Sequence, residues 1–500
     1  MVSRSIYVLF FLLIISFRFY PQEMARDTTN KYPFSSVSEF WSQMNDIFND
    51  PNFSNSQWGV VIQSLETGEY LYKRNEDKLF IPASDLKLFT TSAGLITLGS
   101  EYRFKTNLYM NGYVDGSILK GDVVVQGRGD PTISERFYNG NMLKIYQDWA
   151  DSLLNIGIDE ITGNIVGDDN AFDDLGLGAG WAWDYESNWF AAPTSAISFN
   201  DNCVDIVVTV NKKSHLPEVN VLPDTKYVII LNKAITVPRD SSTNIETFRE
   251  PGTNVITVFG TIRDNSDSVK TFVTVNNPTQ YAMVVLKDVL KRRGILIDGY
   301  PIDVNDMTST PDYGKMKLIF TQYSPSLKEI IKVTNKQSQN LYAEQLLKTI
   351  GLETRGFGTI ANGIITESRV LRDMGINPES MNIVDGSGLS RLDLATPRQI
   401  VALLSYMYKS RYFIPFFNSL PIAGVDGTLG DRMQNGKAQG KIRAKPGFLE
   451  GVRNLSGYAF TGDNEPIAFS LVVNNFSVPV KLADNIQDLV CLRIANFKRK

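Results

Sequence analysis

The order of helix-type and strand-type patterns is the feature that most constrains how this 500-residue chain can fold. The middle of the chain is rich in strands and turns, with strand-type runs at 121–126, 204–210, 227–231 and 255–261. Helix-type spacing of apolar residues lies on both sides of that region, at 81–96, 279–293, 326–332, 341–350 and 482–490. We therefore expect one α/β (α+β) domain formed by residues 30–105 and 275–500. An inserted β-rich region at 106–274, divided into two small domains, interrupts it.

Shorter signals refine this outline. A predicted β-hairpin at 58–74 turns at Thr67 and Gly68, directly before the helix at 81–96. Late in the chain, strands are predicted at 440–448, 454–460 and 466–474. Gly351 follows the helical pattern at 341–350, and glycine is a favourable helix stop, so we expect that helix to end there.

Composition excludes several classes of protein. Hydrophobic residues make up 43% of the chain, which is enough for large cores. The 50 Lys and Arg residues against 54 Asp and Glu, with no long basic run, predict no nucleic-acid partner. Cys203 and Cys491 are too few for a disulfide framework or a thiolate metal cluster, although one disulfide between them stays open.

The N-terminus is typical of an exported protein. An apolar run at 6–17 follows Arg4, and it is too short for a membrane span but fits a secretory signal. We predict a signal peptide at 1–22, followed by a polar tether up to Lys31. Because no clear cleavage site follows, an uncleaved anchor with peripheral membrane association is the alternative.

Ser84 and Lys87 are the first candidates for chemistry. They stand three residues apart at the start of the helix at 81–96, so that their side chains share one face. The chain contains a single histidine, His215, in a polar stretch, so a serine nucleophile here needs lysine as its base. One Ser-x-x-Lys match alone is better explained by a helix start with a solvated lysine.

Two further motifs change that balance. Ser338-Gln-Asn340 and Lys445-Pro446-Gly447 follow Ser84-x-x-Lys87 in the order known for serine β-lactamases and penicillin-binding proteins. With Ser84 and Ser338 254 positions apart, the chain resembles the D-alanyl-D-alanine carboxypeptidase/endopeptidase type of penicillin-binding protein, peptidase family S13. Other segments that carry the resemblance are 127–131 (GRGDP), 167–172 (GDDNAF), 180–184 (GWAWD), 198–202 (SFNDN), 385–391 (DGSGLSR) and 424–429 (GVDGTL).

The resemblance implies a fold and a set of roles. It implies an antiparallel sheet flanked by helices, as in penicillin-binding proteins and serine β-lactamases, interrupted by inserted domains. Ser84 would attack the carbonyl between two D-alanines, and Lys87 would take its proton. Ser338 would relay a proton to the leaving amine, and Asn340 would bind the substrate amide and orient Lys87. Backbone N–H groups of Ser84 and Phe448 would form the oxyanion hole.

Lys445 would be a second cation that lowers the pKa of Lys87. Substrate contacts are expected from Gly447, from Arg391 and, in the inserted region, from Asp168. Trp181 and Trp183 either line the cleft or pack between domains, and packing is the favoured interpretation.

Pro446 departs from the family pattern. The family has threonine or serine there, whose hydroxyl binds the terminal carboxylate of the substrate, and proline offers neither O–H nor N–H. Losing one such hydrogen bond typically costs about 1.5–3 kcal/mol, or roughly ten- to a hundredfold in specificity constant. Arg443 or Lys445 would be the cations that compensate.

The sequence thus predicts an exported, periplasmic serine carboxypeptidase/endopeptidase of peptidoglycan stem peptides that penicillins acylate at Ser84. No cofactor and no metal is expected, because one histidine cannot supply the usual zinc ligands. Two alternatives stay open: a catalytically impaired scaffold that binds peptidoglycan, with Pro446 as its sign, and a β-lactamase-like hydrolase.

Overall fold

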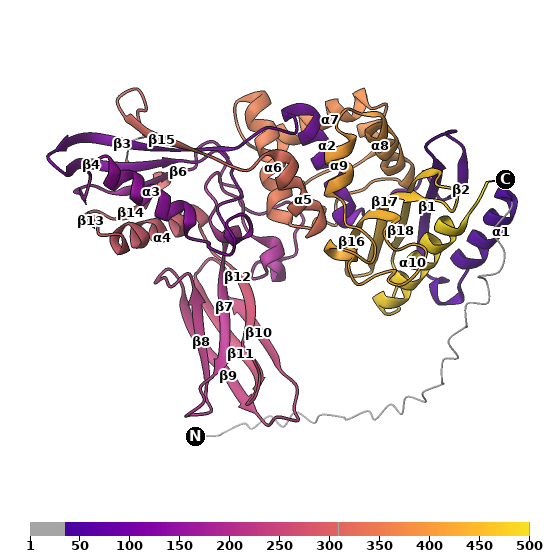
Figure 1. Ribbon diagram of the computed structural model, residues 1–500, viewed down its shortest axis with the longest axis horizontal. Helices are drawn as coiled ribbons and strands as arrows, with labels where there is room; N and C mark the ends of the chain where they lie inside the picture. The colour runs from indigo at the N-terminus through magenta and orange to yellow at the C-terminus, as the bar shows by residue number, and fades with distance from the viewer. Residues whose placement is uncertain (1–35, 309, 500) are drawn as a thin grey trace, which may run out of the picture.

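The computed structural model describes residues 36–308 and 310–499, so the predicted signal peptide at 1–22 and the tether up to Lys31 lie outside the described residues. The two ends of the described chain meet in one antiparallel sheet, with strand order β16-β17-β18-β1-β2 (Figure 1). Its strands are β1 (Gln57–Ser64), β2 (Tyr70–Arg74), β16 (Ile442–Leu449), β17 (Val452–Phe460) and β18 (Pro466–Asn474). The predicted hairpin and the three late strands are confirmed.

Helices cover both faces of this sheet. Val60 and Ile62 of β1 pack with one set, while Val61 packs with the other, as alternation along a strand requires. The first set is α1 (Val37–Phe48) and α10 (Val480–Asn496). The second set is α2 (Leu86–Leu98), α5 (Leu327–Lys336), α6 (Asn340–Arg355), α7 (Ile360–Asp373), α8 (Pro397–Lys409) and α9 (Phe413–Ser419). We call the sheet and these helices the catalytic body, and its architecture confirms the predicted fold class.

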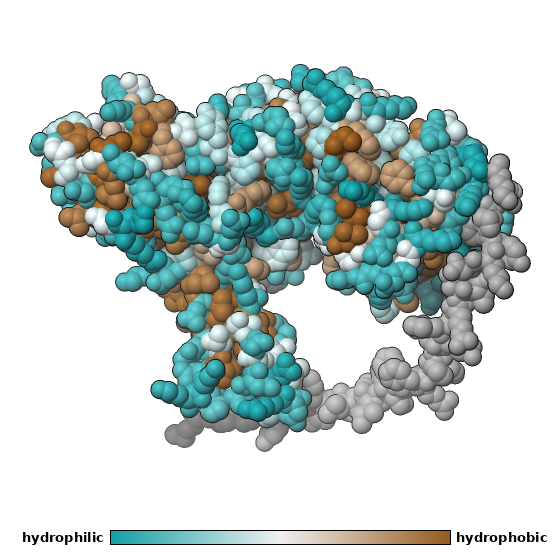
Figure 2. All heavy atoms as spheres, in the orientation of Figure 1, coloured by the Kyte–Doolittle hydropathy of each residue, from teal (hydrophilic) through white to brown (hydrophobic). Residues whose placement is uncertain are grey.

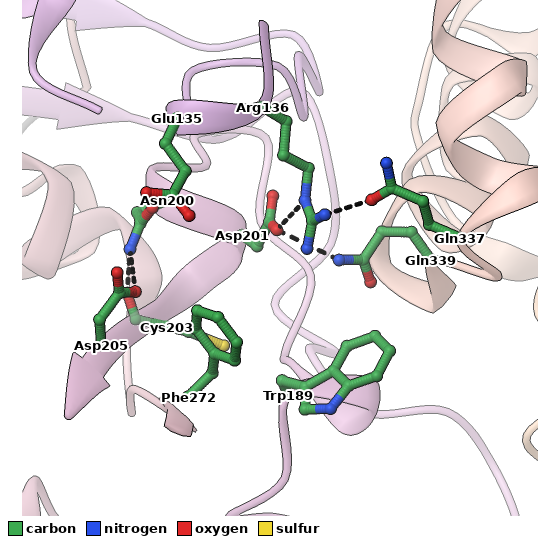
Figure 3. Close-up of a pocket in the computed structure, with 10 residues that line it drawn as sticks. All are labelled: Glu135, Arg136, Trp189, Asn200, Asp201, Cys203, Asp205, Phe272, Gln337 and Gln339. Atoms are coloured by element: carbon green, nitrogen blue, oxygen red, sulfur yellow. Dashed lines mark hydrogen bonds and ion pairs between the residues drawn. The ribbon is translucent and has the colours of Figure 1, made fainter. Parts of the chain in front are cut away.

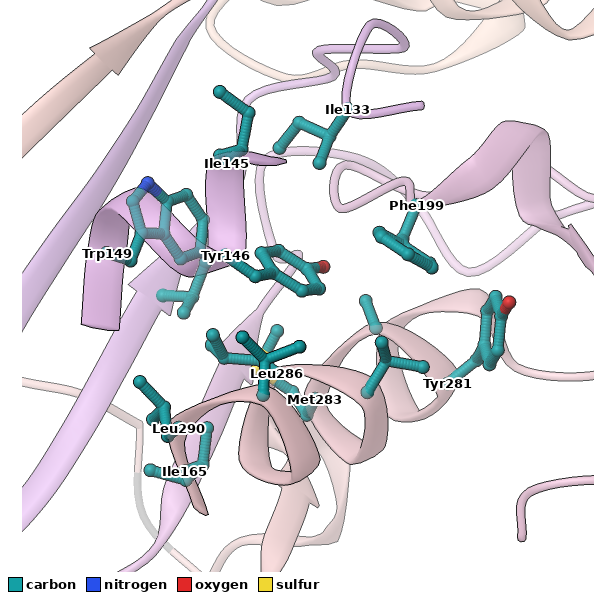
Figure 4. Close-up of a cluster of buried hydrophobic side chains, with 14 of the residues drawn as sticks. Ile133, Ile145, Tyr146, Trp149, Ile165, Phe199, Tyr281, Met283, Leu286 and Leu290 are labelled. Atoms are coloured by element: carbon teal, nitrogen blue, oxygen red, sulfur yellow. The ribbon is translucent and has the colours of Figure 1, made fainter. Parts of the chain in front are cut away.

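A first inserted unit lies beside the catalytic body. Its strands are β3 (Lys105–Asp115), β4 (Ile118–Gln126), β5 (Glu160–Ile161), β6 (Ile165–Asp168), β13 (Leu296–Ile297), β14 (Pro301–Asp303) and β15 (Lys317–Tyr323). Helices α3 (Lys144–Asn155) and α4 (Pro278–Arg292) pack on this sheet. Figure 4 shows the core between them, with Tyr146 and Trp149 of α3 facing Met283, Leu286 and Leu290 of α4.

A second unit is nested inside the first, between β6 and α4. It consists of two three-stranded sheets, β12-β7-β8 and β10-β11-β9, which project from the rest of the molecule (Figure 1). The strands are β7 (Cys203–Val210), β8 (Pro217–Leu222), β9 (Ile229–Val237), β10 (Asn244–Arg249), β11 (Val255–Arg263) and β12 (Val269–Thr274). Figure 2 shows hydrophilic side chains over its tip and hydrophobic ones where it joins the larger body. We call it the outer unit.

Two elements that follow the expected boundary at 274/275 pack with the first inserted unit. The apolar stripe of α4 packs against α3 in the core of the first inserted unit, and β15 pairs with β3. At the two ends of the insertion, the backbone N–H of Phe104 donates to Ser324 Oγ at 2.9 Å and the N–H of Ser324 donates to the Phe104 carbonyl at 3.1 Å. We therefore propose that the catalytic body resumes near Ser324.

The expected helix stop at Gly351 is wrong. Helix α6 continues to Arg355 and ends at Gly356, whose φ of 82° is the left-handed conformation that favours glycine. Gly351 lies where α6 crosses α7, and a Cβ there would come within 2.8 Å of the Gly363 backbone nitrogen. Glycine at 351 therefore allows close helix packing rather than a helix end.

The structure also bears on the possible disulfide and on membrane-spanning helices. Cys203 in β7 and Cys491 in α10 are both buried free thiols, so the disulfide left open by the sequence is not formed. Within 36–308 and 310–499, no helix has both the length and the apolar character that a membrane span needs.

Candidate active site

Ser84 lies in a tight turn immediately before α2. The 3-10 turn η3 (Ala83–Asp85) leads into the helix, and Ala83 has a left-handed φ of 45°, which is uncommon for a residue with a side chain. Asn454 of β17 donates from Nδ2 to the carbonyl of Pro82 at 2.6 Å. A Cβ at Gly388 would come within 1.8 Å of the Ala83 carbonyl oxygen, so only glycine allows that loop to pack here. Neighbouring elements thus hold the strained turn in place.

Lys87 reaches Ser84 as the spacing predicts, one helical turn on. Its fully buried Nζ donates to Ser84 Oγ at 3.2 Å, to Asn340 Oδ1 at 2.6 Å and to the carbonyl of Ser387 at 2.7 Å. Burial lowers the pKa of Lys87 to about 8, although the nearby Asp385 and Glu344 act in the opposite direction. Once neutral, the amine can keep its bonds to Asn340 and Ser387 and turn its lone pair toward the Ser84 hydroxyl.

Ser338 and Lys445 complete a chain of contacts on the other side of Ser84. Ser338 Oγ donates to Ser84 Oγ at 3.0 Å, and Lys445 Nζ donates to Ser338 Oγ at 2.9 Å. Lys445 also donates to the Pro446 carbonyl at 2.8 Å and is fully buried. Burial, and then the charge of Lys87, hold the pKa of Lys445 well below its usual range. The structure therefore brings all three predicted motifs together.

Asn340, the first residue of α6, connects the site to the inserted region. Its Oδ1 accepts from Lys87, while its Nδ2 donates to the backbone carbonyl of Phe190 at 2.7 Å. Phe190 belongs to the 3-10 turn η6 (Trp189–Ala191), far away in sequence. The orienting role expected for Asn340 toward Lys87 has direct geometric support, whereas its amide N–H₂ group is engaged by the inserted region.

Strand β16 forms the open edge of the sheet beside Ser84. The N–H of Ala444 donates to the Pro421 carbonyl and not to β17, so the nitrogens of Pro446 and Phe448, two and four residues on, face the same open side. Pro446 thus removes no bond from the ladder. A Cβ at Gly447 would lie 3.0 Å from the Pro82 carbonyl oxygen, so glycine lets β16 pass close to the Ser84 turn. The oxyanion hole formed by Ser84 and Phe448 stays a prediction, to which this orientation lends support.

A cavity of about 600 Å³ opens over Ser84. It is lined by Ser84, Tyr185, Trp189, Phe190, Gln337, Ser338, Asn340, Gly388, Leu389, Thr428, Pro446, Phe448, Leu449, Glu450 and Arg453. Its walls come from the catalytic body and from the inserted region, as a cleft for an extended peptide requires. Within the described ranges, 36–308 and 310–499, no group of three or more His, Cys, Asp or Glu side chains is arranged to hold a metal ion.

Arg391, Asp168 and Arg443 lie outside the residues that line this cavity, as do Gly447 and Lys445. Arg391 donates to the backbone carbonyl of Glu450 at 2.6 Å and so holds the turn between β16 and β17. Asp168, at the end of β6, accepts a hydrogen bond from Tyr313. Arg443 lies 4.5 Å over the ring of Phe417, whereas the arginine that lines the cavity is Arg453. Substrate binding by Arg391 or Asp168 stays a prediction.

Trp181 and Trp183 differ in how far they are packed. Trp181 packs against the buried cluster that contains Ala83 and Leu389, and its Nε1 donates to Asp385 Oδ2 at 2.9 Å, so that the packing interpretation holds for it. Trp183 is 77% exposed, and packing is wrong for that residue.

Sequence patterns missed several buried groups around the site. Asp85 accepts from Ser456 at 2.5 Å, and burial raises its pKa to about 7. Glu344 accepts from the backbone N–H groups of Gly386 and Ser387, and so fixes the carbonyl that receives Lys87. Asp85 is next to Ser84 in sequence, so its position could have identified it as a residue of the site. No local sequence feature identifies Glu344 as one.

The comparisons with known proteins agree with this geometry. Residues 41–495 match the D-Ala-D-Ala carboxypeptidase 3 (S13) family. A D-alanyl-D-alanine carboxypeptidase from Actinomadura sp. (strain R39) is 30% identical over 472 residues, which cover 92% of this chain and 85% of that protein. The penicillin-sensitive carboxypeptidase A of Dictyostelium discoideum is 28% identical over 503 residues and covers 91% of each chain.

The fold is similar to that of a solved structure as well. The crystal structure of penicillin binding protein 4 (dacB) from Haemophilus influenzae superimposes with a TM-score of 0.75 at 23% identity, and the match covers 92% of this chain and all of that one. The family expected from the three motifs is thereby confirmed, because the match extends over both the catalytic body and the inserted units. The chain belongs to the D-Ala-D-Ala carboxypeptidase 3 (S13) family.

Proposed function

We propose that this protein is a serine carboxypeptidase and endopeptidase that cleaves peptidoglycan stem peptides through an acyl-enzyme on Ser84. The observation that carries the proposal is the continuous set of contacts from Lys445 through Ser338 and Ser84 to Lys87. A hydroxyl and a buried amine whose pKa is about 8 form the nucleophile and base that acyl transfer needs. Membership of a carboxypeptidase family supports the same chemistry.

The proposed reaction has two steps, acylation of Ser84 and hydrolysis of the acyl-enzyme. Lys87 takes the proton of Ser84 Oγ as that oxygen bonds to the carbonyl carbon of the penultimate D-alanine. The C–N bond then breaks, and Ser338 passes its proton to the leaving amine and takes one from Lys445, which donates to its hydroxyl. Water hydrolyses the resulting ester and restores Ser84. The N–H of Phe448, on the open edge of β16, would bind the oxyanion.

β-Lactams are the proposed acylating inhibitors. They present a carbonyl to the same serine, and a relative is named as a penicillin-sensitive carboxypeptidase. The departure at Pro446 predicts slow acylation and not its absence, since every residue of the contact chain is present. We further propose export to the periplasm, which depends on the predicted signal peptide at 1–22.

Fluorescent penicillin labelling of the wild type and of Ser84→Ala tests the proposal. A stable label on the wild type and none on the variant are expected. An unlabelled wild type would favour a scaffold without turnover, and rapid loss of the label would favour a β-lactamase-like hydrolase. Mass spectrometry of products from crosslinked and uncrosslinked muropeptides then separates endopeptidase from carboxypeptidase activity.

A further inference from the structure

The turn that carries Ser338 is conformationally strained. Ser338 lies between the end of α5 and the start of α6 with a left-handed φ of 57°, which is costly for a residue with a side chain. Yet its hydroxyl must stay within hydrogen-bond reach of both Ser84 and Lys445. Something outside the turn has to hold it.

Both neighbours of Ser338 reach the same ion pair in the inserted region (Figure 3). Arg136 donates from Nη1 to Gln337 Oε1 and from Nε to Asp201 Oδ2, the latter at 2.6 Å. Gln339 donates from Nε2 to the same Asp201 oxygen at 3.2 Å. One side of the turn is therefore held by the cation and the other by the carboxylate.

The carboxylate is itself fixed. Asp201 lies in η7 (Asn200–Asn202), where its own φ is 55° and those of its two neighbours are also positive. Its other oxygen accepts from Tyr342 of α6 at 3.1 Å. The Asp201 side chain is only 14% exposed and that of Arg136 is 28% exposed, so solvent screens this pair less than a pair on the open surface.

These contacts favour a structural role over a ligand site. A cavity of about 290 Å³ lies beside the pair and shares Trp189 and Gln337 with the cavity over Ser84. Its charged groups already pair with one another or with Lys270, which contacts both Glu135 and Asp205. The Arg136–Asp201 pair instead fixes the side chains of Gln337 and Gln339.

We propose that Arg136 and Asp201 are positioning residues for Ser338, so that the inserted region sets the geometry of proton transfer to the leaving group. The inference rests on the proposed acyl-enzyme function. Because Ser338 acts on the leaving group and neither Arg136 nor Asp201 lines the cavity over Ser84, the pair affects the rate constant of acylation and leaves the binding of penicillin nearly unchanged.

Stopped-flow acylation by a fluorescent penicillin tests this with Arg136→Met, which keeps the stem and removes the hydrogen bonds. We expect the limiting acylation rate constant to fall about tenfold while the half-saturating penicillin concentration stays within about twofold. A rate constant measured on the labelled population does not depend on how much of the sample is folded. A variant that only unfolds would lose labelled protein and keep the rate constant.

Arg128→Met is the matched control. Arg128 also pairs across from the inserted region to the catalytic body, with Glu353 at 3.1 Å, but it does not touch the Ser338 turn. The two arginines are 35% and 28% exposed, whereas Glu353 is more exposed than Asp201. It should keep the wild-type rate constant. The acylation rate constant should fall less in Asp201→Asn, which retains an oxygen acceptor, than in Asp201→Ala.

Two outcomes would overturn the inference: a wild-type rate constant in Arg136→Met, or an equal loss in Arg128→Met. Failure of the proposed function is distinguishable, because the wild type itself would then carry no label on Ser84.

Discussion

The catalytic body and the outer unit use β-strands in opposite ways. All nine residues of β18 are buried, because helices cover both faces of its sheet. In β9 of the outer unit, residues 229, 231, 232, 233 and 235 are exposed, and Ile229 and Ile235 are 60% and 58% exposed. The body is a two-sided scaffold that can fix side chains at short distances, whereas the outer unit covers only one face of each sheet.

The inserted region contributes to the site only where it meets the body. The Phe190 carbonyl accepts a hydrogen bond from Asn340, and the Asp201 carboxylate accepts one from Gln339. Trp181 donates a hydrogen bond to Asp385. The tip of the outer unit carries none of these contacts. Function should therefore be sensitive to substitutions in the body and along this junction, and insensitive to those in the outer sheets.

The largest expected effect comes from removing the base. Lys87→Met should lower acylation by roughly 10²–10⁴-fold, because a positioned general base contributes about that much. Lys348→Met is the matched control, since Lys348 is also a buried lysine, bonded to Asp173 at 2.7 Å at the junction with the inserted region. Stopped-flow acylation measures both. A similar loss in the two variants would mean that burial of a lysine, and not its contact with Ser84, is what matters.

The pH dependence of acylation should be the next largest effect. Burial lowers the pKa of Lys87 to about 8, so the neutral amine becomes scarcer as the pH falls below that value. If the rate follows the neutral fraction, acylation should rise about fiftyfold from pH 6 to pH 8 and level off above pH 9. The residual rate of Lys87→Met should not show this rise. A flat wild-type profile over the same range would exclude Lys87 as the base.

Pro446 offers a gain of function of intermediate size. Pro446→Thr restores a hydroxyl on the open edge of β16 and should raise the specificity constant for penicillin about tenfold. Pro446→Ala, which lacks the hydroxyl, is the control and should stay near the wild type. Equal gains in both variants would show that the proline ring, and not the missing hydroxyl, limits acylation.

The smallest effect is expected in the outer unit. Ile235→Thr changes an exposed side chain and should alter the free energy of unfolding by less than about 0.5 kcal/mol. Val258→Thr in the neighbouring strand buries a hydroxyl and should cost about 1–3 kcal/mol. Urea titrations measure both, and neither variant should change the acylation rate constant. A slowed acylation in either would show that the outer sheets reach the site.

Local patterns predicted the parts of this molecule that are locally determined. Ser84 and Lys87 meet because one helical turn separates them, and the late strands follow from alternation and β-rich composition. The order of the three motifs also predicted contacts between distant segments, since Ser338 lies against Ser84 and Lys445 lies against Ser338.

What sequence reasoning missed depends on contacts between distant segments. The later boundary that we propose near Ser324 could not be inferred from the sequence, because an amphipathic helix such as α4 does not reveal which core its apolar stripe joins. The pattern at 341–350 predicts a helix end at Gly351, although the role of this glycine is set by α7, which crosses α6 there. The carbonyl of Phe190 behind Asn340 leaves no trace in side-chain chemistry, because any residue can supply it.

The most direct test of the account is to locate the penicillin adduct by peptide mass spectrometry, in the wild type and in Lys87→Met, after equal exposure. We predict an adduct on the peptide that contains Ser84 in the wild type and almost none in the variant. An adduct on another residue, or equal labelling of Ser84 in both proteins, would contradict it.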